Sequence, residues 1–288
     1  MAVTAAGRRV LAAIEERIDP VARDRFEVVA PVGLPLIVAK TPERFAVAFT
    51  TRLVGVEAGS PGHRFDLSMD PGSSPRPRHG RHREHLSTAL AELAGTAAPS
   101  LVSPTQVHGV RVVGAAEYAR DGCASACDGL TVQPGLDSGL AALLVFADCV
   151  PVVLLGEIDG AVVHGGWRGL LAGVVQQGAA SMTAPPGLAI IGPSIGPCCY
   201  TVGEKVALDF ERRYGDGVVL PGRRLDLWEA ATRAAGEVGV PRSRVVNPRL
   251  CTVCNRDLFF SYRADGPGTG RHGTVLWCAA GDVPVGSA

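Results

Sequence analysis

Several features that are common in other classes of protein are scarce in this sequence, and each absence narrows the function. Aromatic residues make up only 5% of the chain, and lysine occurs only at Lys40 and Lys205. The 28 basic residues, almost all arginine, are balanced by 28 acidic residues, so the formal net charge is zero. A neutral chain has no general electrostatic attraction to nucleic acid or to anionic lipid. We therefore expect neither nucleic acid nor a membrane among its partners.

Long hydrophobic segments are also lacking. The longest apolar stretch, residues 140–155, contains Asp148 and Pro151, so it is too short and too interrupted to cross a bilayer. The first 20 residues have no apolar core of the signal-peptide kind. The eight cysteines are expected to be free thiols or metal ligands, because a chain of this size without an export signal seldom depends on disulfides. Together these features predict a cytoplasmic protein.

Short apolar runs that alternate with Gly-rich turns make up most of the chain, a pattern typical of a single mixed α/β domain. Residues 1–24 predict an N-terminal helical extension ended by Pro20, and residues 25–288 predict the main domain. Residues 57–83, rich in Gly, Pro, Ser and Arg, predict a loop. The expected strands are 34–39, 45–49, 140–147, 151–155, 160–163, 188–191, 259–262 and 274–278, and the expected helices are 85–93, 170–182, 204–213 and 227–238.

The residues with the most chemical potential lie where predicted strands end. His108 lies in TQVHG, Cys149 follows an apolar run in FADCVP, and His164 ends AVVH. Side chains converge at such positions in α/β proteins. A His–Cys–His set can hold zinc with an open fourth position, or form a thiolate–imidazole pair for nucleophilic attack. Because the spacing matches no short zinc motif, a core cysteine with two ordinary histidines is the competing interpretation.

The segment HGGWRG adds a candidate anion site. It joins a predicted strand to a predicted helix, and backbone N–H groups at a helix start can bind an anion. Arg168 offers a planar donor fork suited to phosphate or carboxylate. The alternative is a tight turn in which the glycines only permit close packing. Arg263 and Arg271 flank a second Gly-rich loop, where they are either phosphate ligands or solvated side chains.

The remaining cysteines and basic residues are interpreted as structural. Cys198 and Cys199 are adjacent in sequence, which is more typical of packing residues than of joint ligands. Cys251 and Cys254 form CTVC, half of a zinc site, but no second pair with suitable spacing exists. The basic run within residues 76–85 has no interleaved aromatic residues, so a solvated loop and helix start is favoured over an RNA site.

Five motifs occur in one order along the chain: TQVHG, ADCVP, HGGWRG, IGPSIGPCCY and CTVCNRDLFFSYRADGPGTGRHG. In these motifs residues 45–280 closely resemble the laccase-domain family, also called multicopper polyphenol oxidase-like or peptidoglycan-editing-factor proteins. Members are described as purine nucleoside phosphorylases with adenosine deaminase activity. The resemblance implies an α/β (α+β) fold, a layered sandwich of helices around mixed β-sheets, and it assigns the catalytic role to the main domain.

The resemblance also implies site residues. The metal ligands of the family correspond to His108, Cys149 and His164, of which Cys149 and His164 are also expected to be catalytic. Arg52, in Thr50-Thr51-Arg52, matches an arginine of the family. Two departures stand out: HGGWRG replaces the usual HAGWRG, and Asp66 stands where Asn is usual.

The names attached to this family conflict, and the histidine count favours zinc over copper. A multicopper oxidase needs many histidines to hold a mononuclear and a trinuclear copper centre. This chain has seven histidines and no His-x-His pair. A single His₂Cys set can bind one copper ion, but it cannot assemble a laccase-like cluster. The expected cofactor is therefore zinc, with copper the less favoured ion.

The expected activities are a transferase reaction and a hydrolase reaction on small molecules. The transferase is a purine nucleoside phosphorylase acting on adenosine, inosine or methylthioadenosine with phosphate, and the hydrolase is an adenosine deaminase using zinc-activated water. Asp148 is the candidate acid/base or orienting carboxylate. The candidate substrate- and phosphate-binding residues are Arg52, Gln106, Trp167, Arg168, Tyr262 and Arg263. A monomer or small homo-oligomer is expected.

Two other functions use the same residues. In a cysteine amidohydrolase that edits cell-wall precursors, Cys149 is the nucleophile and His164 its base, without a metal. In a non-enzymatic zinc-dependent binding protein for cell division or cell-wall control, the site binds zinc and turns over no nucleoside. Metal content and nucleoside turnover distinguish the three.

Overall fold

The computed structural model of the chain describes residues 4–42, 44–55, 65–68, 77–121 and 126–279. The helices are α1 Ala5–Glu15, α2 Pro77–Ala94, α3 Ala115–Arg120, α4 Trp167–Ala172, α5 Val174–Ala180, α6 Glu204–Tyr214, α7 Leu227–Glu237 and α8 Tyr262–Asp265. The first strands are β1 Phe26–Val29, β2 Leu36–Ala39, β3 Phe45–Thr50, β4 Ser100–Val102, β5 Val112–Gly114, β6 Gly129–Val132 and β7 Leu140–Phe146. The later strands are β8 Val150–Leu155, β9 Gly160–Gly165, β10 Leu188–Ile191, β11 Val219–Leu220, β12 Arg224–Leu225, β13 Val245–Val246 and β14 His272–Cys278.

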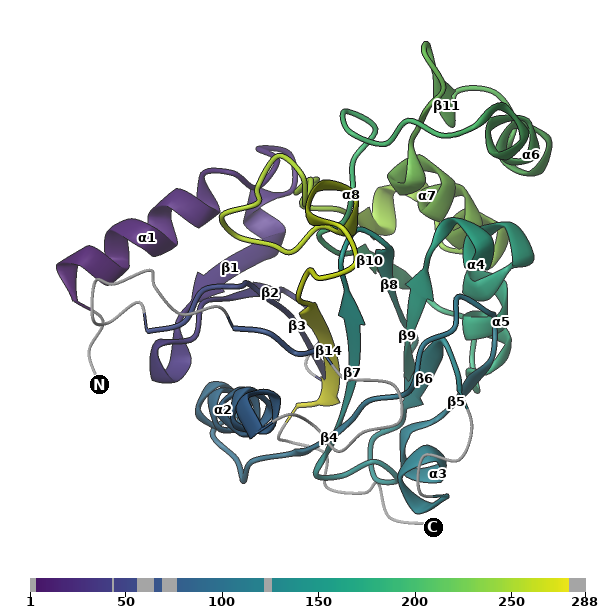
Figure 1. Cartoon of the computed structure of the whole chain (residues 1–288). Coiled ribbons are helices and arrows are strands. Elements are labelled where there is room, and N and C mark those ends of the chain that lie inside the picture. Colours follow the sequence, from purple (N-terminus) through teal and green to yellow (C-terminus); the bar gives the residue numbers. More distant parts are fainter. Residues whose placement is uncertain (1–3, 43, 56–64, 69–76, 122–125, 280–288) are drawn as a thin grey trace.

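Two six-stranded mixed sheets form the centre of the molecule, with helices on their outer faces (Figure 1). The first sheet has the order β1-β2-β3-β14-β7-β4 and the second β13-β10-β8-β9-β6-β5. One apolar cluster lies between the sheets, a second lies between the second sheet and α4–α7, and a third lies between the first sheet and α2. This arrangement confirms the predicted layered sandwich of helices around mixed sheets.

The uninterrupted apolarity of the strands follows from burial on both faces. In β7, Ala142 and Leu144 point into the cluster between the sheets, whereas Ala141 and Leu143 point toward α2. Successive side chains of a strand point to opposite faces, so a strand covered on both sides has no solvent-facing position for a polar residue. The prediction of a buried strand at 140–147 is therefore confirmed, ending at Phe146.

Two chain connections pass from one sheet to the other at the same place. Strands β4 and β7 are parallel neighbours in the first sheet, with Ser100 opposite Leu140. From them the chain runs to β5 and β8 of the second sheet. The first connection contains His108 and the second contains Asp148 and Cys149. Parallel pairing thus places both connections at one end of the sandwich, next to the end of β9.

Three predicted elements were wrong in type or extent. Residues 259–262 do not form a strand: Phe259 closes a turn through its N–H to the Asn255 carbonyl, and α8 follows. The predicted helix 170–182 is divided into α4 and α5 at Gly173, whose φ of 89° breaks the helical path. Helix α2 begins at Pro77, before the predicted start at residue 85, so the predicted loop extends too far. The rest of that loop, residues 57–64 and 69–76, lies outside the described residues.

The N-terminal helix is attached to the main core. Ile14 of α1 and Ile18, just after the helix, are each 1% exposed within the cluster between the sheets. The Thr4 hydroxyl accepts the Gly7 N–H and caps the first turn. Among the helices that the structure describes, none has the length and apolarity to cross a membrane.

A buried histidine between the sheets gives a pH-dependent stability. His272 in β14 is 1% exposed, and its ring centroid lies 5.2 Å from that of Phe259 and 6.5 Å from that of Phe146. Burial lowers the pKa of His272 to about 3. In the unfolded chain the His272 ring is protonated near pH 6.5, whereas in the folded chain it is protonated only near pH 3. The contribution of His272 to the free energy of unfolding is therefore fully present above pH 6.5 and is lost as the pH falls toward 3.

We expect His272→Phe to flatten this dependence. From pH 7 to pH 4 the free energy of unfolding of the variant should fall by up to roughly 3 kcal/mol less than that of the natural chain. Urea denaturation of both proteins at the two pH values measures the difference. An equal fall in the two proteins would contradict the assignment.

Candidate active site

His108, Cys149 and His164 converge at the end of the sandwich where the two connections pass between the sheets. His108 comes from the β4–β5 connection, Cys149 directly precedes β8, and His164 lies in β9. The ligand atoms of the three residues all lie within 4.8 Å of one another. The β8–β9 hairpin supplies the close pairing, because its register sets Pro151 opposite His164 and Val150 opposite Gly165. The predicted convergence is therefore present.

Asp128, immediately before β6, holds His108 and His164 in place. Its side chain is fully buried and accepts the backbone N–H groups of Val107, His108 and Gly109 at 2.7–3.2 Å. It also lies 2.9 Å from Nδ1 of His164. A carboxylate at Nδ1 keeps the proton on that nitrogen and leaves Nε2 free as a ligand or base. One carboxylate thus orients both histidines.

Each of the two connections contains one residue with a strained backbone. His108 has a φ of 61° and Asp148 a φ of 94°, both in the left-handed region that residues with a Cβ rarely adopt. Such conformations cost on the order of 1–3 kcal/mol each and persist only where surrounding contacts impose them. At His108 the Asp128 carboxylate imposes it through three consecutive N–H groups.

The charges of the site favour a thiolate. Burial raises the pKa of the Cys149 thiol. The charge of His164 and hydrogen bonds with His108 and His164 outweigh this effect and bring the pKa down to about 6. Burial lowers the pKa of His164, but the Cys149 thiolate and Asp128 raise it to about 9. Burial likewise raises the pKa of Asp128, and its bonds with His164 and the loop N–H groups bring it below its ordinary value. Without a metal, the site is therefore a thiolate–imidazolium pair.

The donor set fits a single metal ion. Two imidazoles and one thiolate within reach of one another match a three-ligand site with an open fourth position. The carboxylate on Nδ1 of His164 is the outer contact that metal-binding histidines usually make. Zinc takes this donor set, as does a single copper ion. Among the described residues, the other group that can hold a metal consists of cysteines alone.

A small residue is required beside the ligands. A Cβ added to Gly166 would lie 3.0 Å from Cδ2 of His108 and 3.1 Å from Sγ of Cys149. We expect Gly166→Ala to push these two ligands apart and to weaken metal binding by about tenfold or more. Competition with a chromophoric chelator measures this affinity.

Gly187→Ala provides the matched control, because a Cβ at Gly187 meets nothing within 4 Å. It should leave metal affinity unchanged. Equal affinity in the Gly166→Ala protein would show that the ligands have more room than the contacts imply.

Asp148 has both carboxylate oxygens engaged by the protein. Oδ1 accepts the Thr252 hydroxyl at 2.6 Å, and Oδ2 accepts the backbone N–H of Arg263 at 2.6 Å. Asp148 is 9% exposed. These bonds favour the orienting role predicted for it, since they fix the segments around residues 252 and 263 beside Cys149.

Tyr200 lies within electrostatic range of the Cys149 thiolate and of two arginines, Arg263 and Arg168. Arg263 stacks on the Tyr200 ring at 4.8 Å and donates to the Thr201 carbonyl. Burial, and then the charge of Cys149, raises the pKa of Tyr200 to about 12, while Arg263 and Arg168 oppose that rise. Arg168 is exposed and its guanidinium lies 4.4 Å from the centre of the Trp167 ring.

The other predicted binding residues are placed differently. Arg52 stacks on Phe260 at 4.5 Å and, with Arg256, Asp257, Asp265, Gly268 and Thr269, lines an open pocket of about 410 Å³. None of the three ligand residues lines this pocket. The Gln106 amide both donates to and accepts from the backbone of Val145, which clips the β4–β5 connection to β7. Tyr262 is 53% exposed, at the start of α8.

Sequence reasoning missed Asp128, Tyr200 and Thr252, and it missed the proximity of four cysteines. Asp128 carries a partial sequence signal, because it forms an Asp-Gly pair at the start of the apolar strand β6. Thr252 and Tyr200 carry none, since their roles arise from contacts between distant segments. No second pair has a suitable spacing in sequence, yet Cys198 and Cys199 lie beside CTVC: the sulfur atoms of residues 198, 199, 251 and 254 lie within 4.8 Å of one another.

The chain and its fold are those of a known family. The family described as multi-copper polyphenol oxidoreductase laccase matches residues 46–279, and the chain belongs to it. The predicted family is thereby confirmed.

Relatives and solved structures agree with this assignment. A purine nucleoside phosphorylase, YlmD, of Geobacillus stearothermophilus is 32% identical over 247 residues, which cover 78% of this chain and 88% of that protein. A purine nucleoside phosphorylase of Xylella fastidiosa is 34% identical over 191 residues, covering 60% of this chain and 73% of that protein. The crystal structure of Neisseria meningitidis protein NMB0706 superposes with a TM-score of 0.71 at 30% identity, covering 85% of this chain and 99% of the other.

Proposed function

We propose that this protein is a zinc-dependent purine nucleoside phosphorylase that also deaminates adenosine. The observation that carries the proposal is the His108–Cys149–His164 set, whose ligand atoms lie within 4.8 Å of one another and which Asp128 holds in place. Arg263 and Arg168 act together with Cys149 on the pKa of Tyr200. The names of the Geobacillus and Xylella relatives support the phosphorylase activity. Zinc, when bound, supplies a Lewis acid that polarises the substrate and activates water.

The residues around the ligands account for the two substrates. Arg168 and Arg263 offer guanidinium groups for the phosphate oxygens, because charge-assisted bonds to arginine are short and strong. Asp148 holds the backbone of Arg263 and so fixes where that side chain begins. A purine has aromatic partners in Tyr262, which is half exposed, and in Trp167, whose ring has Arg168 on one face.

His164 and Asp128 form a buried pair that determines where the proton of the His164 ring lies. His164 keeps its Nδ1 proton toward Asp128, so its other nitrogen faces Cys149. Without a metal, the Cys149 thiolate and then Asp128 stabilise the positive charge of a protonated His164 and raise its pKa to about 9. The contact with Asp128 fixes the ring orientation that a ligand requires.

Products formed from adenosine test the proposal directly. The zinc-loaded protein is incubated with adenosine, with and without phosphate, and the bases and nucleosides are separated by chromatography. Adenine and ribose 1-phosphate are expected only with phosphate, and inosine is expected in both reactions. Absence of all these products would refute the proposed function.

The thiolate–imidazolium pair favours one alternative, a metal-free cysteine amidohydrolase. In it, the Cys149 thiolate attacks a carbonyl carbon and His164 supplies the proton to the leaving amine. Protein purified without added metal distinguishes the two. Zinc that is lost on Cys149→Ala supports the metalloenzyme, whereas a metal-free Cys149 that reacts rapidly with iodoacetamide supports the hydrolase.

A further inference from the structure

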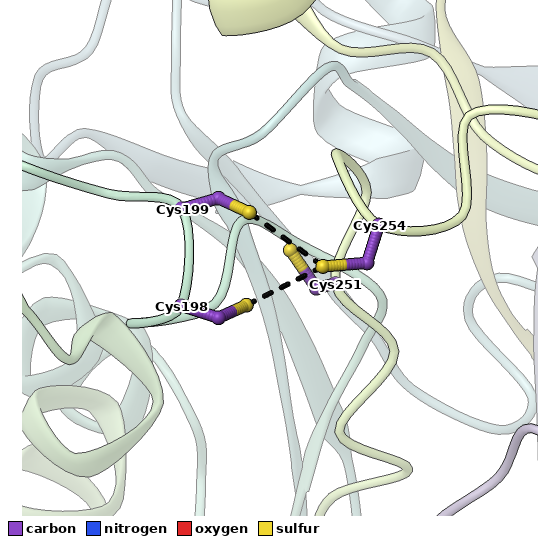
Figure 2. Close-up of side chains that lie close together, drawn as sticks. All are labelled: Cys198, Cys199, Cys251 and Cys254. Carbon is purple, nitrogen blue, oxygen red and sulfur yellow. Dashed lines mark hydrogen bonds between the residues drawn. The ribbon is translucent and has the colours of Figure 1, made fainter.

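Four cysteines from two distant segments meet outside the active site (Figure 2). Cys198 and Cys199 lie in the loop after β10, and Cys251 and Cys254 lie in the loop after β13. The parallel pairing of β10 with β13 brings these loops together, and Ser194 continues the pairing through its bridge to Cys251. The meeting of the four thiols is thus built on the sheet and on backbone hydrogen bonds.

The distances between the sulfur atoms are those of ligands around one ion. Sγ of Cys254 lies 3.6 Å from Sγ of Cys198 and 3.5 Å from Sγ of Cys199, and all four sulfurs lie within 4.8 Å of one another. Tetrahedral zinc with Zn–S bonds of about 2.3 Å separates its thiolates by about 3.8 Å. A disulfide requires about 2.05 Å, and all four cysteines are free.

Packing does not explain why these side chains converge. Cysteine usually contributes to a protein as a small buried apolar residue. Here Cys198 and Cys254 are exposed and Cys199 is half buried, so their convergence removes little apolar surface from water. Hydrogen bonds between thiols are weak and add little in compensation. Only Cys251 of the four is buried, so the meeting of the four sulfurs is better explained by a ligand that binds them all.

The surroundings fit a closed thiolate site. The backbone N–H of Gly196 donates to Sγ of Cys251 at 3.3 Å, the outer contact expected of a metal-bound thiolate. Gly196 is itself packed against the Trp228 ring, and Trp228 donates to the Ser194 hydroxyl, so the loop is held in place. Four thiolates select zinc or iron. A span below 4.8 Å suits a single ion, because thiolates on different irons of a cluster lie further apart.

We propose that Cys198, Cys199, Cys251 and Cys254 form a second metal site, a closed tetrathiolate zinc site that fastens the loop after β10 to the loop after β13. With four protein ligands it has no open position, so its role is structural. It does not depend on the proposed function, and it is connected to the active site only through the loops themselves.

That connection is short. Thr252, between the two cysteines of CTVC, donates its hydroxyl to Asp148, the neighbour of Cys149. The Asp148 carbonyl in turn accepts the Ile195 N–H from the other loop. Both loops joined by the zinc ion therefore contact the same residue. Loss of the ion should loosen both loops and lower the midpoint of thermal unfolding.

Zinc counts in a set of variants test the site. Each protein is purified under reducing conditions without added metal, and zinc per chain is measured by mass spectrometry. About two zinc ions per chain are expected in the natural protein, about one in Cys149→Ala, about one in Cys254→Ser and none in the double variant. Cys278→Ser, which removes a thiol outside both groups, should keep about two.

The Cys149→Ala protein gives the decisive measurement, since it retains all four thiols and does not require the serine variant to fold. X-ray absorption at its zinc edge should show only sulfur neighbours. Four outcomes would each overturn the inference: no zinc is bound, the zinc has nitrogen or oxygen neighbours, iron is bound in place of zinc, or the four thiols have been converted to disulfides. If the natural protein holds one zinc that Cys149→Ala keeps and Cys254→Ser loses, this site stands and the zinc of the proposed function fails.

Discussion

Cys149→Ala is expected to abolish zinc binding at the active site and to lower adenosine phosphorolysis by roughly a thousandfold or more. The thiolate is the only negatively charged ligand of the three, and its removal leaves His108 and His164 as neutral donors or a repelling pair. The effect is measured as kcat/KM for adenine release in the presence of phosphate, together with zinc content. Cys278→Ser, remote from the ligand set, should keep full activity.

His108→Ala separates this mechanism from thiol catalysis. His108 is a metal ligand in the proposed site, whereas in the metal-free hydrolase His164 alone serves as the base. The metalloenzyme should therefore lose zinc and phosphorolysis together in this variant. Phosphorolysis that survives in either Cys149→Ala or His108→Ala would show that these residues do not carry the reaction.

Asp128→Asn should produce the second large effect, on metal affinity and on folding together. The asparagine amide has the same shape, but its NH₂ group would face either the backbone N–H donors or Nδ1 of His164, so at least one buried hydrogen bond is lost. The negative charge beside His164 is lost as well. We expect zinc affinity to fall by about 10- to 100-fold and the free energy of unfolding to fall by about 3 kcal/mol. Chelator competition and urea denaturation measure the two quantities.

Asp137→Asn is the matched control for this change. Asp137 is 4% exposed and accepts the N–H groups of Ala116 and Gln133, so it is also a buried carboxylate that holds a loop. Its replacement should lower stability but leave zinc affinity unchanged. A similar loss of affinity in both variants would mean that the Asp128 effect is only a general loss of stability.

The sequence predicted the features that depend on local pattern. The strands at 140–146 and 150–155 follow from apolar runs, and the position of Cys149 between them follows from their ends. The order of five motifs identified the family and, with it, the layered fold. The break at Gly173 and the turn at Phe259 were missed because their neighbours have apolar patterns that also suit a continuous helix or a strand.

Contacts between distant segments account for what the sequence did not predict. Nothing in CTVC indicates that Cys198 and Cys199 will lie beside it, since the parallel pairing of β10 with the two-residue strand β13 creates that proximity. Arg52 was grouped with the phosphate-binding arginines by its motif, yet it stacks on Phe260 beside a separate pocket. Motifs locate chemistry along the chain, whereas the packing of loops decides which side chains meet.

The two connections between the sheets make the ligand set sensitive to the spacing of the sandwich. His108 and Cys149 are each carried by a segment with one end fixed in the first sheet and the other in the second, while His164 belongs wholly to the second. A change in the thickness of the core, such as Leu144→Ala at a fully buried position between the sheets, alters the separation of the two anchoring points. The affinity of the site for its metal ion should therefore depend on the distance between the sheets. Hydrostatic pressure, which shortens that distance, should change the metal affinity reversibly.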